Sequence, residues 1–171
     1  MKRIVCGGGA DGLNVVVHQG ALHRVGPDDP ELAAASEASG ERMSLAWAAP
    51  RPVSDTADVS GAHTDLNLQL APGETRFLHV RIAPGAASPM HRTPHITDYL
   101  VAVSGVLTMV LEDGSEVAFE AGDVLVQLGG WHRWRNDGTE PFVMAGVVVG
   151  VETETAVPFG VEVRAEAGSD A

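Results

Sequence analysis

The chain has 171 residues, and at roughly 100–200 residues per domain this length predicts one domain with an extension. The 23 acidic and 11 basic residues give a formal net charge of −12, which excludes nucleic acid and anionic membrane surfaces as expected partners, because both bind clustered Lys and Arg. The lone Cys6 excludes an intrachain disulfide. The apolar start is too short for a signal peptide and no apolar run approaches the roughly 20 residues of a membrane span, so we expect a cytoplasmic protein.

The first 61 residues predict a hairpin, one short helix and a loop. Strands at residues 2–6 and 13–18 flank a Gly-x-Gly-x-x-Gly turn. A dinucleotide fingerprint needs a helix directly after that turn, whereas a Val-rich strand follows here, so we interpret the glycines as a hairpin turn. Asp29 and Pro30 are typical of the first residues of a helix, which would end at Gly40. The stretch 50–61 is expected to be a surface loop.

A regular series of short strands begins at residue 77. The expected strands are residues 77–82, 99–103, 106–112, 116–120, 124–128, 131–135 and 142–149. Asp113-Gly114 predicts a tight hairpin in which both turn residues have positive φ. Short strands between closely spaced turns indicate an all-β sandwich or barrel. The acidic residues 162–171 are expected to form a fraying tail.

The chemistry-bearing residues of this region are three histidines and one acid. A lone histidine is more often inert than a ligand, but His91 and His95 lie close together, Asp98 follows them, and barrel closure could add His132. Imidazole and carboxylate are suitable ligands for a divalent transition metal.

Two segments resemble the conserved motifs of the cupin superfamily. The first motif reads Gly, five residues, His-x-His, three or four residues, Glu, six residues, Gly, and residues 85–105 are similar to it. The second reads Gly, five residues, Pro-x-Gly, two residues, His, three residues, Asn, and residues 122–136 are similar to it. The resemblance extends to a bacterial and fungal branch of single-domain cupins and implies an antiparallel jelly-roll β-barrel.

The departures from these motifs leave three metal assignments open. Thr93 occupies the position of the second His, and Asp98 that of the Glu. The metal would be held by His91, Asp98 and His132 with water, or by the same set with His95 reaching in from a bulged strand, or no metal would be bound. Pro94 makes a regular strand through His95 doubtful, because proline donates no ladder hydrogen bond. The metal itself would be a divalent transition ion such as Fe, Mn, Zn or Ni.

The resemblance implies a small-molecule metalloenzyme, with dioxygenase, decarboxylase, isomerase or cyclase chemistry on a small carboxylated, ketonic or aromatic substrate. The alternative is a metal-free binding or sensing cupin. Tyr99 is a candidate acid, base or substrate hydrogen-bond donor, and Gln127, an amide within an apolar run, is a candidate that orients a ligand.

The expected organisation has three parts. Residues 1–65 would pack as strands and loops on the barrel, residues 66–160 would form the barrel, and residues 161–171 would form a flexible acidic tail. Cupins commonly dimerise and barrel edges tend to be covered by pairing, so we expect a homodimer.

Overall fold

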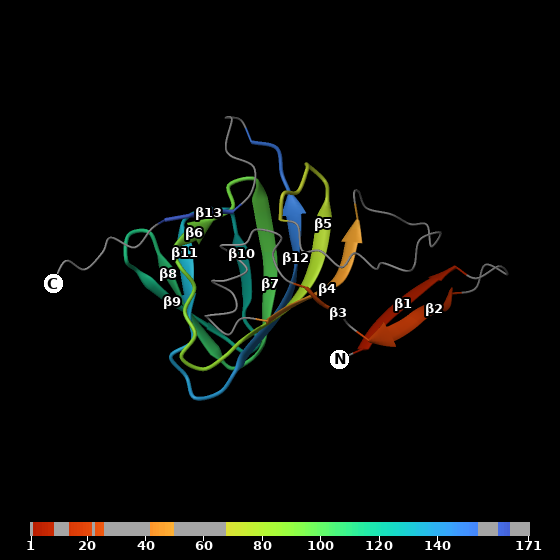
Figure 1. Ribbon diagram of the computed structural model, residues 1–171, viewed down its shortest axis with the longest axis horizontal. Helices are drawn as coiled ribbons and strands as arrows, with labels where there is room; N and C mark the ends of the chain where they lie inside the picture. The colour runs from red at the N-terminus through yellow and green to blue at the C-terminus, as the bar shows by residue number, and fades with distance from the viewer. Residues whose placement is uncertain are drawn as a thin grey trace.

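The computed structural model describes residues 2–8, 14–21, 23–25, 42–49, 68–153 and 161–164. Every regular element in these residues is a β-strand (Figure 1). The strands are β1 (Lys2–Gly8), β2 (Asn14–Ala21), β3 (His23–Val25), β4 (Arg42–Ala49), β5 (Thr75–Ile82), β6 (His91–Arg92), β7 (Ile96–Ser104), β8 (Val106–Leu111), β9 (Glu116–Glu120), β10 (Val124–Gln127), β11 (His132–Arg135), β12 (Phe142–Gly150) and β13 (Glu162–Val163). Within the described residues there is no helix long and apolar enough to cross a membrane.

Two antiparallel sheets form the jelly-roll barrel. One has the order β10-β7-β12-β5-β4-β3 and the other the order β13-β6-β11-β8-β9. Neighbours such as β7 and β12 are far apart in sequence, which is the crossover pattern of a jelly roll. Strands β1 and β2 pair as a separate hairpin. Strands β3 and β4 continue the six-stranded sheet beyond β5, so part of the N-terminal extension belongs to the barrel sheet.

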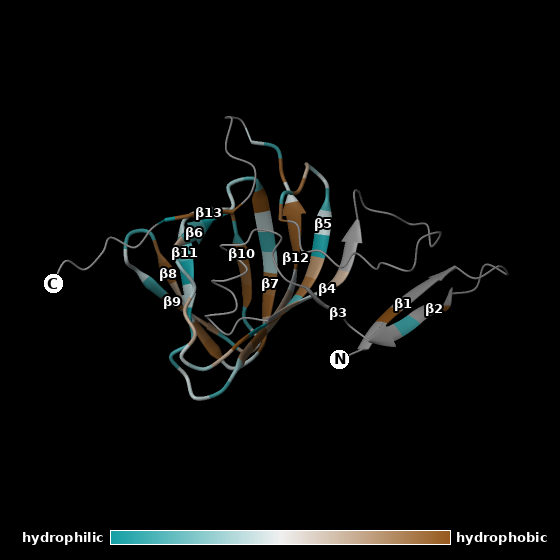
Figure 2. Ribbon diagram, viewed as in Figure 1, coloured by the Kyte–Doolittle hydropathy of each residue, from teal (hydrophilic) through white to brown (hydrophobic). Residues whose placement is uncertain are grey.

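The core lies between the two sheets because apolar residues alternate along the strands. On β12, residues from Phe142 to Gly150 are alternately buried and partly exposed. Apolar side chains from both sheets meet in the interior, among them Leu78, Leu107 and Phe142. Figure 2 shows the brown, hydrophobic colouring concentrated on the central strands β7, β10 and β12. A period of two with one face inward is what a half-buried strand requires.

The hairpin between β8 and β9 is present, but its predicted turn geometry is wrong. Gly114 has φ of +82°, whereas no non-glycine residue of the described chain has positive φ, so Asp113 is in an ordinary conformation. The amide of Gly114 donates to Leu111 O and the amide of Leu111 donates to Ser115 O, which closes a three-residue loop. Such loops place glycine alone in the left-handed region.

Several other expectations differ from the structure or fall outside it. The helix predicted for residues 29–40 and the loop at 50–61 lie outside the described residues. Strands β3, β4 and β6 were not predicted. Glu162 and Val163, assigned to the fraying tail, instead form β13 against β6, where the Glu162 carboxylate accepts hydrogen bonds from Arg92.

Candidate functional site

Two histidines meet on neighbouring strands of the five-stranded sheet. Residue His132 on β11 is the direct cross-strand partner of His91 on β6. Their ring centroids are 4.4 Å apart, with the ring planes tilted by 54°. His132 is buried and His91 is partly buried. The structure therefore brings together two residues separated by forty positions in the sequence.

Backbone carbonyls fix the tautomer of both rings. His91 Nδ1 lies 2.9 Å from Pro89 O, and His132 Nδ1 lies 2.8 Å from Gly130 O. A carbonyl oxygen only accepts, so in each ring Nδ1–H is the donor. The lone pair of the neutral imidazole is then on Nε2 in both histidines. Metal-binding histidines are commonly oriented in this way by a hydrogen bond from the other ring nitrogen.

Burial keeps both imidazoles uncharged at neutral pH. Burial lowers the pKa of His91 below its ordinary value of 6.5. The pKa of His132 is lowered to about 4, first by burial and then by the proximity of His91. Because the pKa values lie below 7, the lone pairs are available at neutral pH without prior loss of a proton.

The facing sheet contributes Asp98 and Gln127. Asp98 on β7 and Gln127 on β10 are cross-strand partners. Along each strand, buried and exposed residues alternate, and both residues occupy positions on the inward-facing side. The Gln127 amide nitrogen donates to Gly130 O over 3.0 Å and lies 3.0 Å from His132 Nδ1. Gln127 and His132 therefore both donate to one carbonyl, and Gln127 packs beside the His132 ring from the opposite sheet.

The Asp98 carboxyl has a strongly altered pKa. Burial raises its pKa from 3.8 to about 7. The Asp98 carboxyl is therefore close to the point where it gains or loses a proton at neutral pH. Perturbed titration of this kind is common at functional sites.

His95 is placed by a turn between the two sheets. The backbone turns at Pro94 and His95, closed by a hydrogen bond from the amide of Ile96 to Thr93 O over 2.9 Å. The structure shows this turn in place of the bulged strand considered from the sequence. His95 is buried at 2% exposure, and its Nε2 lies 3.1 Å from Leu68 O, so Nε2–H is the donor. A metal would therefore have to bind His95 through Nδ1.

Tyr99 lies on the other face of β7. Its side chain is 53% exposed, whereas the adjacent residue Leu100 is buried in the core. The alternation of the strand therefore directs Tyr99 to the outer face of the six-stranded sheet, and the structure does not bring it to the histidine pair.

Among the described residues, no group of three or more His, Cys, Asp or Glu side chains is gathered in a metal-binding arrangement. The chemistry of the site still fits a divalent transition metal in two respects. Two neutral imidazoles present Nε2 lone pairs, and a carboxylate faces the same interior from the opposite sheet. Nitrogen and oxygen donors of this kind suit Fe, Mn, Ni or Zn.

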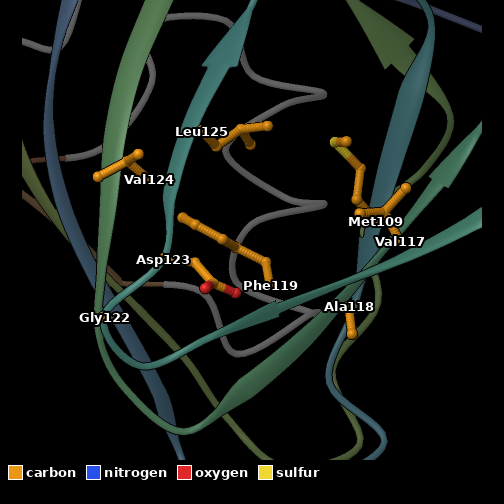
Figure 3. Close-up of a pocket in the computed structure, with 8 residues that line it drawn as sticks. All are labelled: Met109, Val117, Ala118, Phe119, Gly122, Asp123, Val124 and Leu125. Carbon is orange, nitrogen blue, oxygen red and sulfur yellow. The ribbon is translucent and has the colours of Figure 1, made fainter.

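A cavity of about 360 Å³ between β8, β9 and β10, lined by apolar side chains and Asp123, was not predicted from the sequence (Figure 3). Met109 on β8 and Leu125 on β10 extend toward each other from opposite sides of this cavity in Figure 3, while Val124 points away. The only signal in the sequence is the alternation of residues 106–111, which identifies Met109 as inward-facing but not the space in front of it.

A cluster of Arg92, Trp131, Glu162 and Arg164 beside His91 was also not predicted from the sequence. The guanidinium carbons of Arg92 and Arg164 lie 4.9 and 4.4 Å from the centroid of the Trp131 ring. Arg92 is also paired with Glu162 over 3.0 Å. These contacts hold β13 on the strand that carries His91. Stacking of guanidinium groups on an indole ring stabilises such arrangements.

Comparisons with known proteins agree with this geometry. Residues 78–150 match the model of the family described as Cupin domain. A cupin-domain-containing oxidoreductase, fogC of Aspergillus ruber, is 37% identical over 90 residues, which cover 51% of this chain and 43% of that protein. The oryzines biosynthesis cluster protein J of Aspergillus oryzae is 29% identical over 122 residues, covering 70% of this chain and 67% of that protein. The chain thus spans less than half the length of the first curated relatives it matches.

A solved structure supports the fold. The crystal structure of a sugar phosphate isomerase from a cupin superfamily, from Silicibacter pomeroyi, superposes with a TM-score of 0.52 at 20% identity, covering 75% of this chain and 71% of that chain. At this identity the likeness concerns the fold alone. The jelly-roll barrel and the family match over residues 78–150 agree, and this part of the chain is similar to a cupin domain.

Proposed function

We propose that the chain is a small-molecule enzyme of the cupin type that uses a divalent transition metal at His91 and His132, with Asp98 as the carboxylate of the site. The observation that carries the proposal is the pair of adjacent, uncharged imidazoles, each with Nδ1–H donated to a backbone carbonyl. Two neutral imidazoles whose Nδ1–H groups are used by backbone carbonyls keep their Nε2 lone pairs for another partner. A cation bound by both Nε2 atoms would be such a partner.

The remaining polar side chains have roles that follow from their contacts. Gln127 packs against the His132 ring and restricts its rotation. Asp98 supplies negative charge opposite the imidazoles when ionised, and a proton when neutral. A metal at this site would supply a Lewis acid for a carbonyl or carboxylate oxygen, or a redox centre.

The similarity to a protein named an oxidoreductase and to a biosynthesis cluster protein supports chemistry on a small organic molecule. We propose a compact carboxylated, ketonic or aromatic substrate. The second candidate, a metal-free binding cupin, is favoured by Thr93 in the position of the second motif histidine. Metal content separates the two candidates.

The test compares metal affinities by competition with a chelator for Fe(II), Mn(II), Ni(II) and Zn(II). The double variant His91→Ala/His132→Ala is expected to lose affinity by at least 100-fold, whereas the control His79→Ala, which replaces a histidine on β5, should remain within twofold. The variant His95→Ala decides whether His95 contributes: a loss of 10-fold or more, on the scale typical of residues around a metal, makes it part of the site. Unchanged affinity in the double variant would refute the proposal.

We also propose that the outer face of the six-stranded sheet mediates a homodimer. Val124 and Val126 on β10 are 79% and 54% exposed, and they are cross-strand partners of the exposed Val101 and Tyr99 on β7. A chain of net charge −12 repels a second copy, and these four positions carry no charge. Exposed contiguous apolar patches often mark association surfaces.

Light scattering tests the dimer. The expected mass is twice the 17.8 kDa of one chain. The double variant Val101→Lys/Val126→Lys should give a single-chain mass, and the control Val106→Lys, on β8 of the other sheet, should not. A wild-type mass of one chain would refute the dimer.

A further inference from the structure

We infer that the cavity between β8, β9 and β10 binds the apolar part of the small molecule whose polar group is held at the histidine pair. This inference rests on the proposed function and adds a substrate class to it: an amphipathic molecule with a carboxylate or carbonyl at one end and an alkyl or aromatic group at the other. The volume of about 360 Å³ lies at the lower end of the roughly 300–1,000 Å³ typical of small-molecule sites.

The strand register places two residues of the cavity lining one row away from His132. Across the five-stranded sheet, Val117, Met109 and Trp134 are successive cross-strand partners on β9, β8 and β11. The next row on the same face lies two residues further along β8 and β11 and contains Leu111 and His132. The first row is therefore apolar and contributes Val117 and Met109 to the cavity lining, and the adjacent row carries the histidine.

The six-stranded sheet repeats this division. Leu125 lines the cavity and is the cross-strand partner of the buried Leu100, and the next inward-facing row on the same strands is Gln127 and Asp98. On the inner face of each sheet, an apolar row is thus followed by a row that carries polar side chains, and the two polar rows meet where Gln127 contacts His132. A bound molecule that spans the apolar and polar rows would place its apolar and polar ends in matching surroundings.

Trp134 connects the two regions. Its ring is 5.2 Å from that of His132, in an edge-on arrangement, and 6.4 Å from that of Phe119, which lines the cavity. Trp134 is 6% exposed and packs between Phe119 of the cavity lining and His132.

The charge of the lining assigns the orientation. Among the described residues that line the cavity, Asp123 alone is charged, and its Oδ2 accepts a hydrogen bond from the Glu120 amide over 2.8 Å. No cation of the lining could bind an anionic group, and Asp123 would repel one. An anionic end of the ligand must therefore face the histidines, and an uncharged end must occupy the cavity.

The first arm of the test uses metal-free protein labelled with ¹³C at the methionine methyl groups and titrated with 1-hexanol. The Met109 methyl resonance should shift saturably, while that of Met144, in the core on β12, should not. Each methylene added from 1-butanol to 1-hexanol should raise affinity about fourfold. Val117→Gln should weaken hexanol binding at least fivefold, and the matched control Val106→Gln, a similarly exposed valine on β8, should leave it within twofold.

The second arm compares hexanoate with 1-hexanol on Zn(II)-loaded protein. Hexanoate should bind at least 10-fold more tightly than hexanol, and His91→Ala/His132→Ala should abolish that advantage. If Met109 does not respond, or responds equally in Val117→Gln, the cavity is not the site, whether or not the metal binds. If Zn(II) binds but hexanoate gains nothing over hexanol, the two regions are not one site. If Zn(II) itself does not bind, the proposed function fails and the first arm alone decides the cavity.

Discussion

Replacement of Asp98 by Asn should make the metal-free protein more stable, and more so at high pH. Burial raises the pKa of Asp98 from 3.8 to about 7. A carboxyl whose pKa is higher in the folded state favours folding while it is protonated, and this contribution is lost as the pH rises through 7. Above pH 7 the raised pKa costs about 4 kcal/mol of folding free energy, because the carboxyl is ionised in the folded state. At pH 5 it costs about 2 kcal/mol, because the carboxyl must take up a proton on folding. A neutral amide of the same shape avoids both costs.

The assay is urea denaturation of wild type and Asp98→Asn, without metal, at pH 5 and pH 8. The stabilisation by the variant should be about 2–3 kcal/mol larger at pH 8, which corresponds to a further rise in Tm of about 4–12 °C. Contributions from His91 and His132 occur in both proteins and cancel. The control Asp113→Asn removes an exposed carboxyl whose pKa is lowered by hydrogen bonds from Ser115, so it should shift the pH dependence in the opposite direction. Identical pH dependence of wild type and Asp98→Asn would refute the reasoning.

Three further substitutions test how the structure supports the site. The side-chain amide of Asn136 is fully buried, donates to Ile82 O and Glu140 O, and accepts from the Gly138 amide. Asn136→Ala should therefore lower the free energy of unfolding, measured by urea denaturation, by about 2–4 kcal/mol. A loss below about 1 kcal/mol would contradict this. Gly129→Ala and the control Gly114→Ala both place alanine at a positive φ, +76° and +82°, but only at Gly129 would the new Cβ lie 2.5 Å from a backbone oxygen. Gly129→Ala should therefore lower the free energy of unfolding by more than Gly114→Ala. Equal losses of stability would show that the contact is unimportant. Glu162→Gln should cost at most about 1 kcal/mol, because its ion pair with Arg92 is partly exposed, and a larger loss would mean that β13 is essential to the barrel.

The strands of the barrel could be predicted because their signals are local. Alternation and glycine turns identified every strand from β7 to β12, with ends displaced by a few residues. Strand β4 could not be found in this way, since the alternation of its Ala-rich sequence is weak and it is held by pairing with β5. Strand β13 has two residues and depends on pairing with β6 and on the Arg92–Glu162 ion pair, which are contacts across the fold.

The same distinction applies to the site. The proximity of His91 and His132 followed from the motif spacing, because both residues begin strands that a cupin barrel pairs. The orientation of Tyr99 follows from strand alternation once the inward position of Leu100 is known, and the sequence did not supply that position. The cavity depends on the distance between β8 and β10, which no local pattern contains.

The most direct test of the metal proposal is ¹⁵N NMR of histidine-labelled protein during titration with Zn(II). The account predicts that the Nε2 resonances of His91 and His132 move together to values typical of metal-bound imidazole as one equivalent is added. Their Nδ1 atoms should remain protonated, because each donates to a backbone carbonyl. Zn(II) that leaves both Nε2 resonances unchanged, or that displaces the Nδ1 protons, would contradict the account.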